Sequence, residues 1–278
     1  MKSIITRTIT GLVFILLIIL AFVPFMPVAY SHIIFLVFTL LATQEYFHLV
    51  AKSSENSPQQ FISCMMVVTL LTAFQLVLYS KRLFIILIIV TLLLILSSFV
   101  AELYRKKAKP LQNIALTLLP FFWIALPFAI TSIWMNYFSQ KGVVLALFII
   151  IWLYDTLAYC IGSIIGKHRL FERISPKKSW EGFIGSLLLT IAISTLFFYI
   201  PYFKVHSFTS PIYWAVFAMV IITAATFGDL VESHFKRTAD MKDSGNILPG
   251  HGGILDRFDS FFFAAPIAFA YWIITLMM

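Results

Sequence analysis

Residues 83–103 read LFIILIIVTLLLILSSFVAEL, an apolar run that is interrupted only by a threonine, two serines and a glutamate near its end. A helix of about 20 apolar residues is long enough to cross the hydrocarbon core of a bilayer. The whole chain shares this character, because 61% of its 278 residues are hydrophobic, 12% are charged, and the mean hydropathy is +0.96. Soluble domains carry roughly 25% charged residues. The sequence therefore predicts an integral membrane protein.

Eight further apolar runs are separated from one another by segments that contain charges, Pro, Gly or Asn. Together they predict an all-α, polytopic membrane protein with about nine transmembrane helices. The first run is expected to be a span and not a cleaved signal peptide, because residues 24–27 (PFMP) offer no small-residue cleavage site. The predicted spans are residues 9–25, 33–50, 61–79, 83–103, 114–134, 143–165, 183–202, 211–231 and 258–277.

The basic residues divide unequally between the two sides of this predicted topology. Sixteen of the 20 Lys and Arg residues fall on the side of the N-terminus, including the run of Arg105, Lys106, Lys107 and Lys109, which is predicted to anchor the topology. The positive-inside rule then places the N-terminus in the cytoplasm and the C-terminus outside. The net charge of +8 is explained by this topology and by the anionic leaflet, and no nucleic-acid partner is expected. We expect a plasma membrane of the bacterial inner-membrane type.

The acidic residues gather in the last four spans and their cytoplasmic loops, whereas the first five spans contain few ionisable groups. We therefore predict an N-terminal membrane scaffold over residues 1–141 and a C-terminal catalytic membrane region over residues 142–278. Two cysteines, Cys64 and Cys160, fall inside predicted spans and are interpreted as small apolar side chains without an assigned function.

Two polar segments of the C-terminal region are candidates for function. Asp155 lies well inside the sixth predicted span, where a carboxylate costs about 2.5–3.5 kcal/mol on insertion scales and is a functional candidate by default. A structural hydrogen bond between helices is the alternative. Lys177 and Lys178 precede the seventh span beside a predicted helix start, where Pro176 suits the first turn. Such a helix N-terminus favours phosphate, although a basic loop next to a membrane is an equally simple interpretation.

The third segment, residues 228–259, carries three carboxylates that fit a metal site. If the ninth span begins near Leu255, Asp256 and Asp259 are three residues apart and share one helix face, with Asp229 available from the end of the eighth span. Converging carboxylates repel one another unless a cation joins them. Hard oxygen ligands of this kind suit Mg²⁺, so we predict that these three aspartates bind Mg²⁺.

The same segment carries groups that suit a polyphosphate. The cations that could neutralise a triphosphate are Lys236, Arg237, Lys242 and Arg257. Glycines allow positive φ and close approach of the backbone to a ligand, and they stand at Gly250, Gly252 and Gly253. His251 lies among them and is predicted to contact a phosphate, with a structural donor as the alternative.

Residues 233–259, SHFKRTADMKDSGNILPGHGGILDRFD, resemble the motif of the phosphatidate cytidylyltransferase (CDP-diacylglycerol synthase) family in their S, K-R, K-D, H-G-G and D-R-x-D positions. The segments around Asp155 and over residues 175–182 resemble upstream motifs of the family. The resemblance covers roughly the last 130 residues, and the first five spans match only in being hydrophobic. The chain departs from the family's pattern at Leu157, Cys160 and His234.

The resemblance implies a metal-dependent nucleotidyltransferase of phospholipid biosynthesis, which converts CTP and phosphatidate to CDP-diacylglycerol and pyrophosphate. It also implies Mg²⁺, a second cation such as K⁺, and a homodimer. Catalytic roles then fall to Asp229, Asp256, Asp259, Lys236, Arg237 and Arg257. Substrate-binding roles fall to Asp155, Ser175, Lys177, Lys178, Ser233, Lys242, Asp243, His251, Gly252 and Gly253.

Two other functional classes remain as alternatives. A cation-coupled transporter would use Asp155 and Asp229 to bind an ion, but transporters place such sites at the midplane between related halves, and no internal repeat is present. A membrane transferase that acts on another lipid alcohol or phosphate is closer in chemistry. An assay with labelled CTP and phosphatidate separates all three classes.

Overall fold

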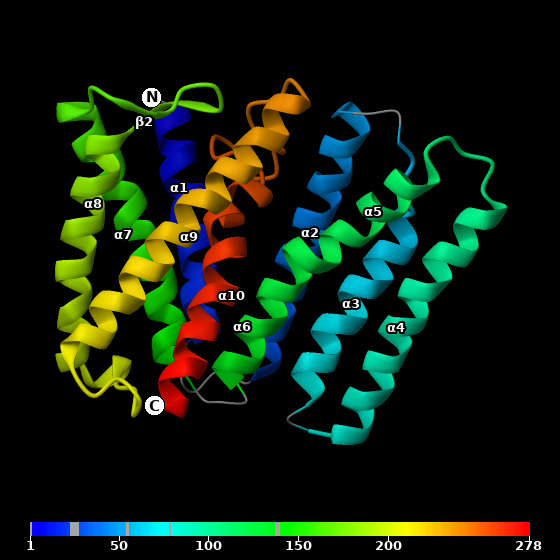
Figure 1. Ribbon diagram of the computed structural model, residues 1–278, viewed down its shortest axis with the longest axis horizontal. Coiled ribbons are helices and arrows are strands. Elements are labelled where there is room, and N and C mark those ends of the chain that lie inside the picture. Colours follow the sequence, from blue (N-terminus) through cyan, green and yellow to red (C-terminus); the bar gives the residue numbers. More distant parts are fainter. Residues whose placement is uncertain (1, 23–27, 54–55, 78, 137–139) are drawn as a thin grey trace. The chain divides into compact units, whose positions relative to one another are not determined.

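The computed structural model describes residues 2–22, 28–53, 56–77, 79–136 and 140–278, and of residues 2–8, 28 and 136 it describes the backbone only. This part of the chain is helical except for one two-stranded sheet (Figure 1). The α-helices are α1 (Lys2–Phe22), α2 (Val28–Ser53), α3 (Gln60–Leu76), α4 (Lys81–Tyr104), α5 (Pro110–Pro120), α6 (Leu126–Asn136), α7 (Lys141–Ile165), α8 (Trp180–Ser194), α9 (Pro211–Thr238) and α10 (Leu255–Met277). The remaining elements are the π-helical turn η1 (Phe121–Ala125), β1 (Arg169–Phe171), β2 (Ser175–Ser179) and the 3₁₀ turns η2 (Thr195–Tyr199) and η3 (Pro201–Phe203).

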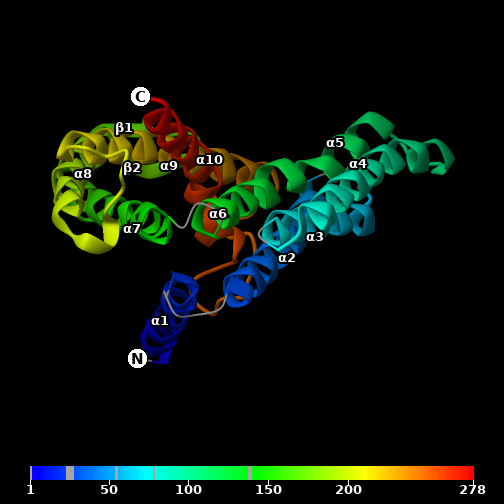
Figure 2. The ribbon, with the colours of Figure 1, turned by 90° about the horizontal axis from the view of Figure 1, so that it is seen from below.

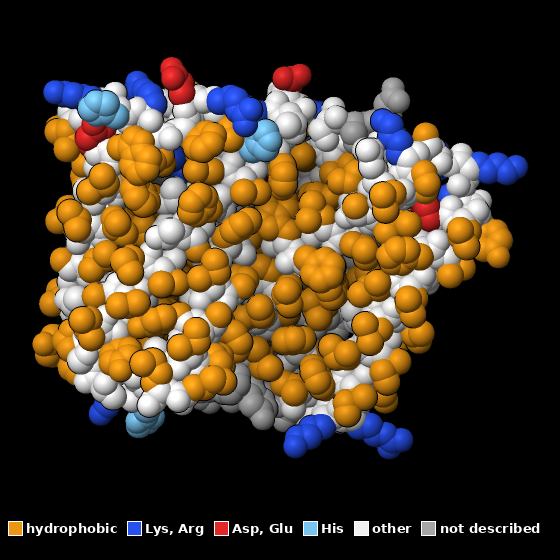
Figure 3. Space-filling view, viewed as in Figure 1, with side chains coloured by type: hydrophobic (Ala, Val, Ile, Leu, Met, Phe, Trp, Pro, Cys, Tyr) orange, Lys and Arg blue, Asp and Glu red, His pale blue; other side chains and the backbone are white. Residues whose placement is uncertain are grey.

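Seven helical segments among the described residues are long and apolar enough to cross a membrane, and residues 9–22 and 60–76 form shorter apolar helices. Each of the nine predicted spans coincides with one of these segments, except that the predicted end of the first span at residue 25 lies outside the described residues. Apolar side chains cover the visible helices along their lengths, and charged side chains gather near the helix ends (Figure 3). The all-α polytopic architecture is confirmed, while the count of nine spans and the orientation stay predictions.

The chain forms two compact units. The first comprises residues 1–139 and 235–258, and the second comprises residues 140–234 and 259–278. The boundary near residue 140 lies close to the predicted division between scaffold and catalytic region. The segment 235–258, which was predicted to belong to the catalytic region, instead packs with the first five predicted spans. The assignment of a scaffold role and a catalytic role stays a prediction.

Aromatic packing explains why the segment 235–258 belongs to the first unit. The ring of Phe258 is almost fully buried, and its centroid lies 5.5 Å from Phe14, 5.3 Å from Phe38 and 4.9 Å from Phe128. These three rings come from α1, α2 and α6. Burial of such large apolar side chains is the main stabilising contribution to packing. The first turn of α10 is therefore held by helices from the N-terminal half of the chain.

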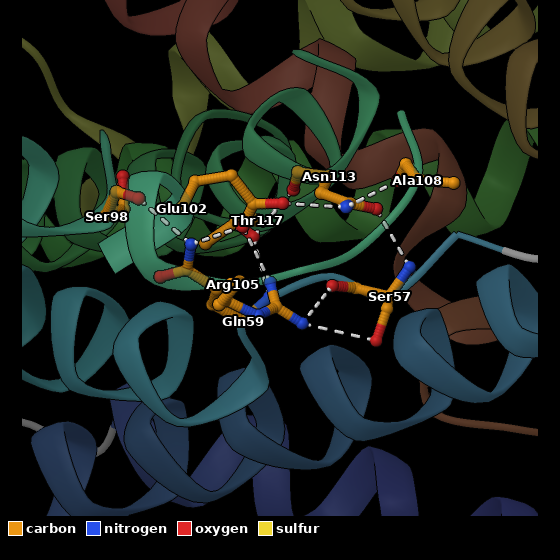
Figure 4. A network of polar contacts seen from close by, with 8 residues as sticks. All are labelled: Ser57, Gln59, Ser98, Glu102, Arg105, Ala108, Asn113 and Thr117. Carbon is orange, nitrogen blue, oxygen red and sulfur yellow. Dashed lines mark hydrogen bonds and ion pairs between the residues drawn. The ribbon is translucent and has the colours of Figure 1, made fainter. Parts of the chain in front are cut away.

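A buried polar network joins α3, α4 and α5 at one end of the first unit (Figure 4). The Glu102 carboxylate accepts hydrogen bonds from Gln59, Asn113 and Arg105, each at 2.8 Å. Arg105 also donates to the carbonyl oxygen of Ser57 at 2.6 Å. Its neighbours in the basic run, Lys106, Lys107 and Lys109, are exposed. Arg105 thus has a structural role that the prediction of a topology anchor did not include.

Arg105→Leu is expected to lower the free energy of unfolding by about 2–3 kcal/mol, because it leaves the buried Glu102 carboxylate without its cation. Lys107→Leu is the matched control and should leave stability within about 0.5 kcal/mol of the parent protein. Denaturation of the purified protein in detergent measures both variants. Equal stability of the two variants would show that the network contributes little.

In the second unit, α7 and α8 lie side by side (Figure 2), and the sheet lies next to the ends where α7 stops and α8 begins (Figure 1). Gly162 of α7 faces Gly182 of α8, and a Cβ atom at Gly182 would lie 2.9 Å from the carbonyl oxygen of Ala158. Small residues of this kind let two helix backbones approach closely in a membrane. The close contact fixes the position of the segment that leads into α8.

The start of α8 differs from the prediction. Pro176, Lys177 and Lys178 lie in strand β2 and not in the first turn of a helix. The helix begins at Trp180, because the extended Ser179 accepts a hydrogen bond from the N–H of Gly182 at 3.1 Å and caps the helix. Pro176 is tolerated in the strand because both strands of a two-stranded sheet are edges. The predicted phosphate cradle at a helix N-terminus is therefore wrong in its geometry, although the two lysines remain next to the helix.

Candidate active site

A cavity of about 330 Å³ in the second unit brings together five of the predicted site residues. These are Asp155, Ser175, Lys177, Lys178 and Asp229. The other walls are mainly apolar or aromatic and are formed by Tyr154, Ala158, Tyr159, Leu170, Ser179, Gly182 and Phe183. Helices α7 and α8, strand β2 and helix α9 supply the charged and aromatic groups. The cavity lining thus combines cationic and acidic side chains with apolar and aromatic ones, as suits an amphipathic anion.

Lys178 and Asp229 form an ion pair inside this cavity, with about a quarter of each side chain exposed. Burial alone would lower the pKa of Lys178, but the carboxylates of Asp229 and Asp259 outweigh it and raise this pKa above its ordinary value. The ammonium group therefore stays charged and can neutralise an anion. Asp229 also accepts a hydrogen bond from the Ser233 hydroxyl at 3.1 Å, which holds the carboxylate in place.

Gly228 explains how α9 and α10 approach each other in the second unit. A Cβ atom at Gly228 would lie 2.6 Å from the carbonyl oxygen of Asp259 and 3.3 Å from the Cα atom of Ser260. Only glycine allows this approach without a shift of the backbone. Because Asp229 follows Gly228 directly, the two aspartates come from neighbouring turns of two packed helices. Asp229, Asp259 and Lys178 thus form one charged cluster.

This cluster fits a divalent cation that is completed by substrate oxygens. Within each unit, no three described His, Cys, Asp or Glu side chains gather closely enough to hold a metal by themselves. Mg²⁺ usually takes only one or two carboxylates and fills its other positions with water and substrate phosphates. Asp229 and Asp259 match that donor set, and the Lys178 ammonium, which pairs with Asp229, offsets only one of their two negative charges. Binding of Mg²⁺ stays a prediction.

Asp256 has different surroundings from the other two aspartates. It lies in the first unit and is 8% exposed. One carboxylate oxygen accepts a hydrogen bond from the Lys236 ammonium at 2.7 Å. The other accepts the backbone N–H groups of Ser244 at 2.9 Å and Gly253 at 2.7 Å. The carboxylate thus fastens the 244–255 loop, and its grouping with Asp229 and Asp259 as a metal ligand remains untested.

The remaining predicted residues lie along this loop and at the helix ends that flank it. Four of them are exposed, namely Arg237, Lys242, Asp243 and Arg257. Gly250 and Gly252 have φ of 81° and 82°, as predicted, whereas Gly253 does not have positive φ. His251 shares a hydrogen bond of 2.9 Å between its Nδ1 atom and Thr10 of α1, so it has the structural contact that was the alternative to phosphate binding. Its contact with phosphate stays a prediction.

One residue of this region was missed by the sequence analysis. Glu45 of α2 is 5% exposed and accepts the N–H groups of Ile254 at 3.0 Å and Leu255 at 2.7 Å, together with the Ser244 hydroxyl at 3.2 Å. An ionisable residue in the middle of a predicted span is itself a signal, and the rule that selected Asp155 would have selected Glu45.

Comparison with known proteins places these features in a family. The family model described as "Cytidylyltransferase family" matches residues 5–275. The chain is 46% identical over 126 residues to a phosphatidate cytidylyltransferase of Staphylococcus aureus (strain COL), covering 45% of this chain and 46% of that protein. It is 43% identical over 128 residues to a phosphatidate cytidylyltransferase of Bacillus subtilis (strain 168), covering 46% of this chain and 45% of that protein. The aligned part therefore spans just under half the length of these relatives. Because the family model covers almost the whole chain, the chain belongs to the cytidylyltransferase family.

Proposed function

We propose that this protein is a phosphatidate cytidylyltransferase, which converts CTP and phosphatidate to CDP-diacylglycerol and pyrophosphate in the membrane. The observation that carries the proposal is the cavity in the second unit, which is lined both by Lys177, Lys178 and Asp229 and by the aromatic side chains of Tyr159 and Phe183. A lipid phosphate has both an anionic head and an apolar body, so it fits such a cavity better than a free nucleotide or a small ion does. Membership of the cytidylyltransferase family supports the nucleotide as the second substrate.

The proposed reaction needs little acid–base chemistry from the protein. An anionic oxygen of the phosphatidate phosphate attacks the α-phosphorus of CTP, and the bond from that phosphorus to the α–β bridging oxygen breaks, so that pyrophosphate leaves. The nucleophile is already ionised at neutral pH, and the protein has mainly to position the reactants and offset their repulsion. Lys178 is placed to hold the lipid phosphate, and the exposed Lys242 and Arg257 are candidates for the triphosphate.

Asp229 and Asp259 would hold Mg²⁺, with Asp256 as a further candidate ligand. The ion would neutralise charge on the triphosphate as pyrophosphate departs. A second cation such as K⁺ and a homodimer, both implied by the family resemblance, remain part of the proposal.

The direct test is an assay of the purified full-length protein in detergent micelles with CTP labelled in its cytidine. We expect a labelled lipid, CDP-diacylglycerol, that forms only when phosphatidate and Mg²⁺ are both present. Diacylglycerol in place of phosphatidate is the control. Product formation from diacylglycerol would instead favour a transferase acting on lipid alcohols. If no labelled lipid forms, and the protein reconstituted in vesicles takes up ions, the transporter is favoured.

The proposal places the site at the cytoplasmic face of the membrane, and cysteine labelling in intact cells tests this. In a variant without Cys64 and Cys160, Lys81→Cys is expected to react with a membrane-impermeant maleimide from outside. The exposed Asn246→Cys is expected to react only after the cells are opened. Labelling of residue 246 in intact cells would reverse the orientation, and labelling of both positions from the same side would show that the number of spans between them is wrong.

A further inference from the structure

The start of α10 lacks a capping side chain of its own. The three residues before Leu255 are Gly252, Gly253 and Ile254, and none of these side chains can accept a hydrogen bond. The first N–H groups of a helix have no partner within the helix and need an acceptor from elsewhere. The carboxylate of Glu45 supplies it, because its two oxygens accept the N–H groups of Ile254 and Leu255 from a position 210 residues earlier in the chain.

The chemistry of the contact requires a carboxylate. All three partners of Glu45 donate hydrogen bonds to it. The N–H of Ile254 donates to one carboxylate oxygen, and the N–H of Leu255 and the Ser244 hydroxyl both donate to the other. A glutamine would direct its NH₂ group toward at least one of these donors. A negative charge at a helix N-terminus is also favoured by the aligned peptide dipoles. A carboxylate is therefore better suited here than any neutral side chain of the same size.

The loop is closely fitted around this carboxylate. A Cβ atom at Gly253 would lie 2.4 Å from one oxygen of Glu45, and a Cβ atom at Gly245 would lie 2.4 Å from the other. Such distances do not occur between real atoms, so a Cβ atom at either position would displace the Glu45 carboxylate or the loop. Glycine at these two positions thus leaves room for the Glu45 side chain, in addition to any role in binding a ligand.

We propose that Glu45 is a positioning residue, which fixes the 244–255 loop and the first turn of α10 before substrate binds. The loop lies between Lys242 and Asp256 and contains His251. Its conformation therefore determines the positions of these three side chains. The kinetic consequence rests on the proposed function, whereas the ordering of the loop does not. Burying a carboxylate in a span is costly, and a site that needed only stable packing would be filled more cheaply by an apolar side chain.

The ordering of the loop can be tested without an activity assay. Ile254→Cys, in a variant without Cys64 and Cys160, places a thiol at a position that is 2% exposed and reacts only when the loop opens. Adding Glu45→Gln is expected to accelerate its reaction with N-ethylmaleimide by about tenfold or more, because hydrogen bonds to a charged group are lost. Glu102→Gln is the matched control, since it removes another buried carboxylate of the same unit whose hydrogen-bond partners lie outside this loop, and it should leave the labelling rate unchanged. Equal rates in the two variants would overturn the proposal.

Gly245 provides a second measurement that does not depend on the stability of one variant. Gly245→Ala should accelerate labelling of Ile254→Cys, because its Cβ atom collides with Glu45, whose side chain supplies all three of the nearest atoms. In a Glu45→Ala background this collision disappears, so Gly245→Ala should add less than about a twofold further change. If the effects of the two substitutions on the labelling rate simply multiply in the double variant, the two residues are not in direct contact.

The kinetic consequence separates positioning from folding. Glu45→Gln is expected to raise the KM for CTP about tenfold while kcat falls less than about threefold. The reason is that the lost hydrogen bonds order the 244–255 loop in the free enzyme, before CTP binds. Glu102→Gln should reduce the yield of folded protein and leave this KM unchanged. An unchanged KM for CTP in Glu45→Gln would remove the positioning role. If the parent protein makes no CDP-diacylglycerol, the proposed function fails, and the labelling rates still decide whether Glu45 orders the loop.

Discussion

Asp259→Asn and Asp229→Asn are each expected to reduce cytidylyl transfer by about 100- to 1,000-fold, the range seen when one group that stabilises charge in a transition state is removed. Asp229 pairs with Lys178, and the neighbouring Gly228 packs against the backbone of Asp259, so the two carboxylates belong to one charged cluster. Asparagine keeps the size of the side chain and removes the charge that Mg²⁺ requires. Initial rates at saturating CTP and phosphatidate measure the effect.

The same two variants should remain folded. Asp229 and Lys178 are partly exposed, and ion pairs of this kind contribute little to stability. Loss of one carboxylate also relieves repulsion between the two in the absence of metal. The melting temperature without Mg²⁺ is therefore expected to stay within about 2 °C of the parent protein, and the stabilisation on adding Mg²⁺ should shrink.

Glu172→Gln is the matched control for these variants. Glu172 is an exposed carboxylate of the segment between β1 and β2 and does not line the cavity. Its replacement should change neither turnover nor the response to Mg²⁺. Near-normal turnover in both aspartate variants would exclude the proposed metal site. A stability loss that is independent of Mg²⁺ and proportional to the loss of activity would show that the aspartates only pair with Lys178.

The part of the site that lines the cavity could be predicted from the sequence because charges in spans are costly. Asp155 and Asp229 stand out for that reason without any knowledge of the fold, whereas Lys178 was selected because it precedes the seventh predicted span beside a predicted helix start. The helix α10 does begin at Leu255, as was assumed when Asp256 and Asp259 were placed on one helix face, although the apolar run of the ninth predicted span begins only at residue 258. Signals of this kind are local in the chain, and sequence spacing is sufficient to find them.

Other features depend on contacts between distant segments, and sequence spacing does not reveal them. Glu45 lies 199 residues before Ser244, so nothing near it indicates that it holds a loop. Strand β2 exists because Ser179 pairs with Arg169 across the hairpin, whereas the local sequence favoured a helix start at Pro176. Arg105 was grouped with the neighbouring lysines by charge alone, and only the position of Glu102 distinguishes it.

Asp256 was grouped with Asp229 and Asp259 because of helical spacing, and its contacts now predict a different response to substitution. Asp256→Asn is expected to lower the free energy of unfolding by about 3–5 kcal/mol, because it removes a carboxylate that is paired with the buried Lys236 ammonium. The melting temperature should fall by at least about 5 °C, equally with and without Mg²⁺. An Asp256→Asn variant as stable as the parent protein would show that these contacts do not hold the loop.

A second substitution separates the contribution of Asp256 to stability from its contribution to activity. Lys236→Met removes the ammonium with which Asp256 pairs, and the asparagine oxygen can still accept the N–H groups of Ser244 and Gly253. The double variant Lys236→Met/Asp256→Asn is therefore expected to regain at least about half of the lost stability. Its turnover should remain below about 1% of the parent value if the Asp256 charge or the Lys236 ammonium also acts on substrate or metal. Recovery of turnover together with stability would make this pair purely structural and would leave Asp229 and Asp259 as the two acidic ligands of the proposed metal site.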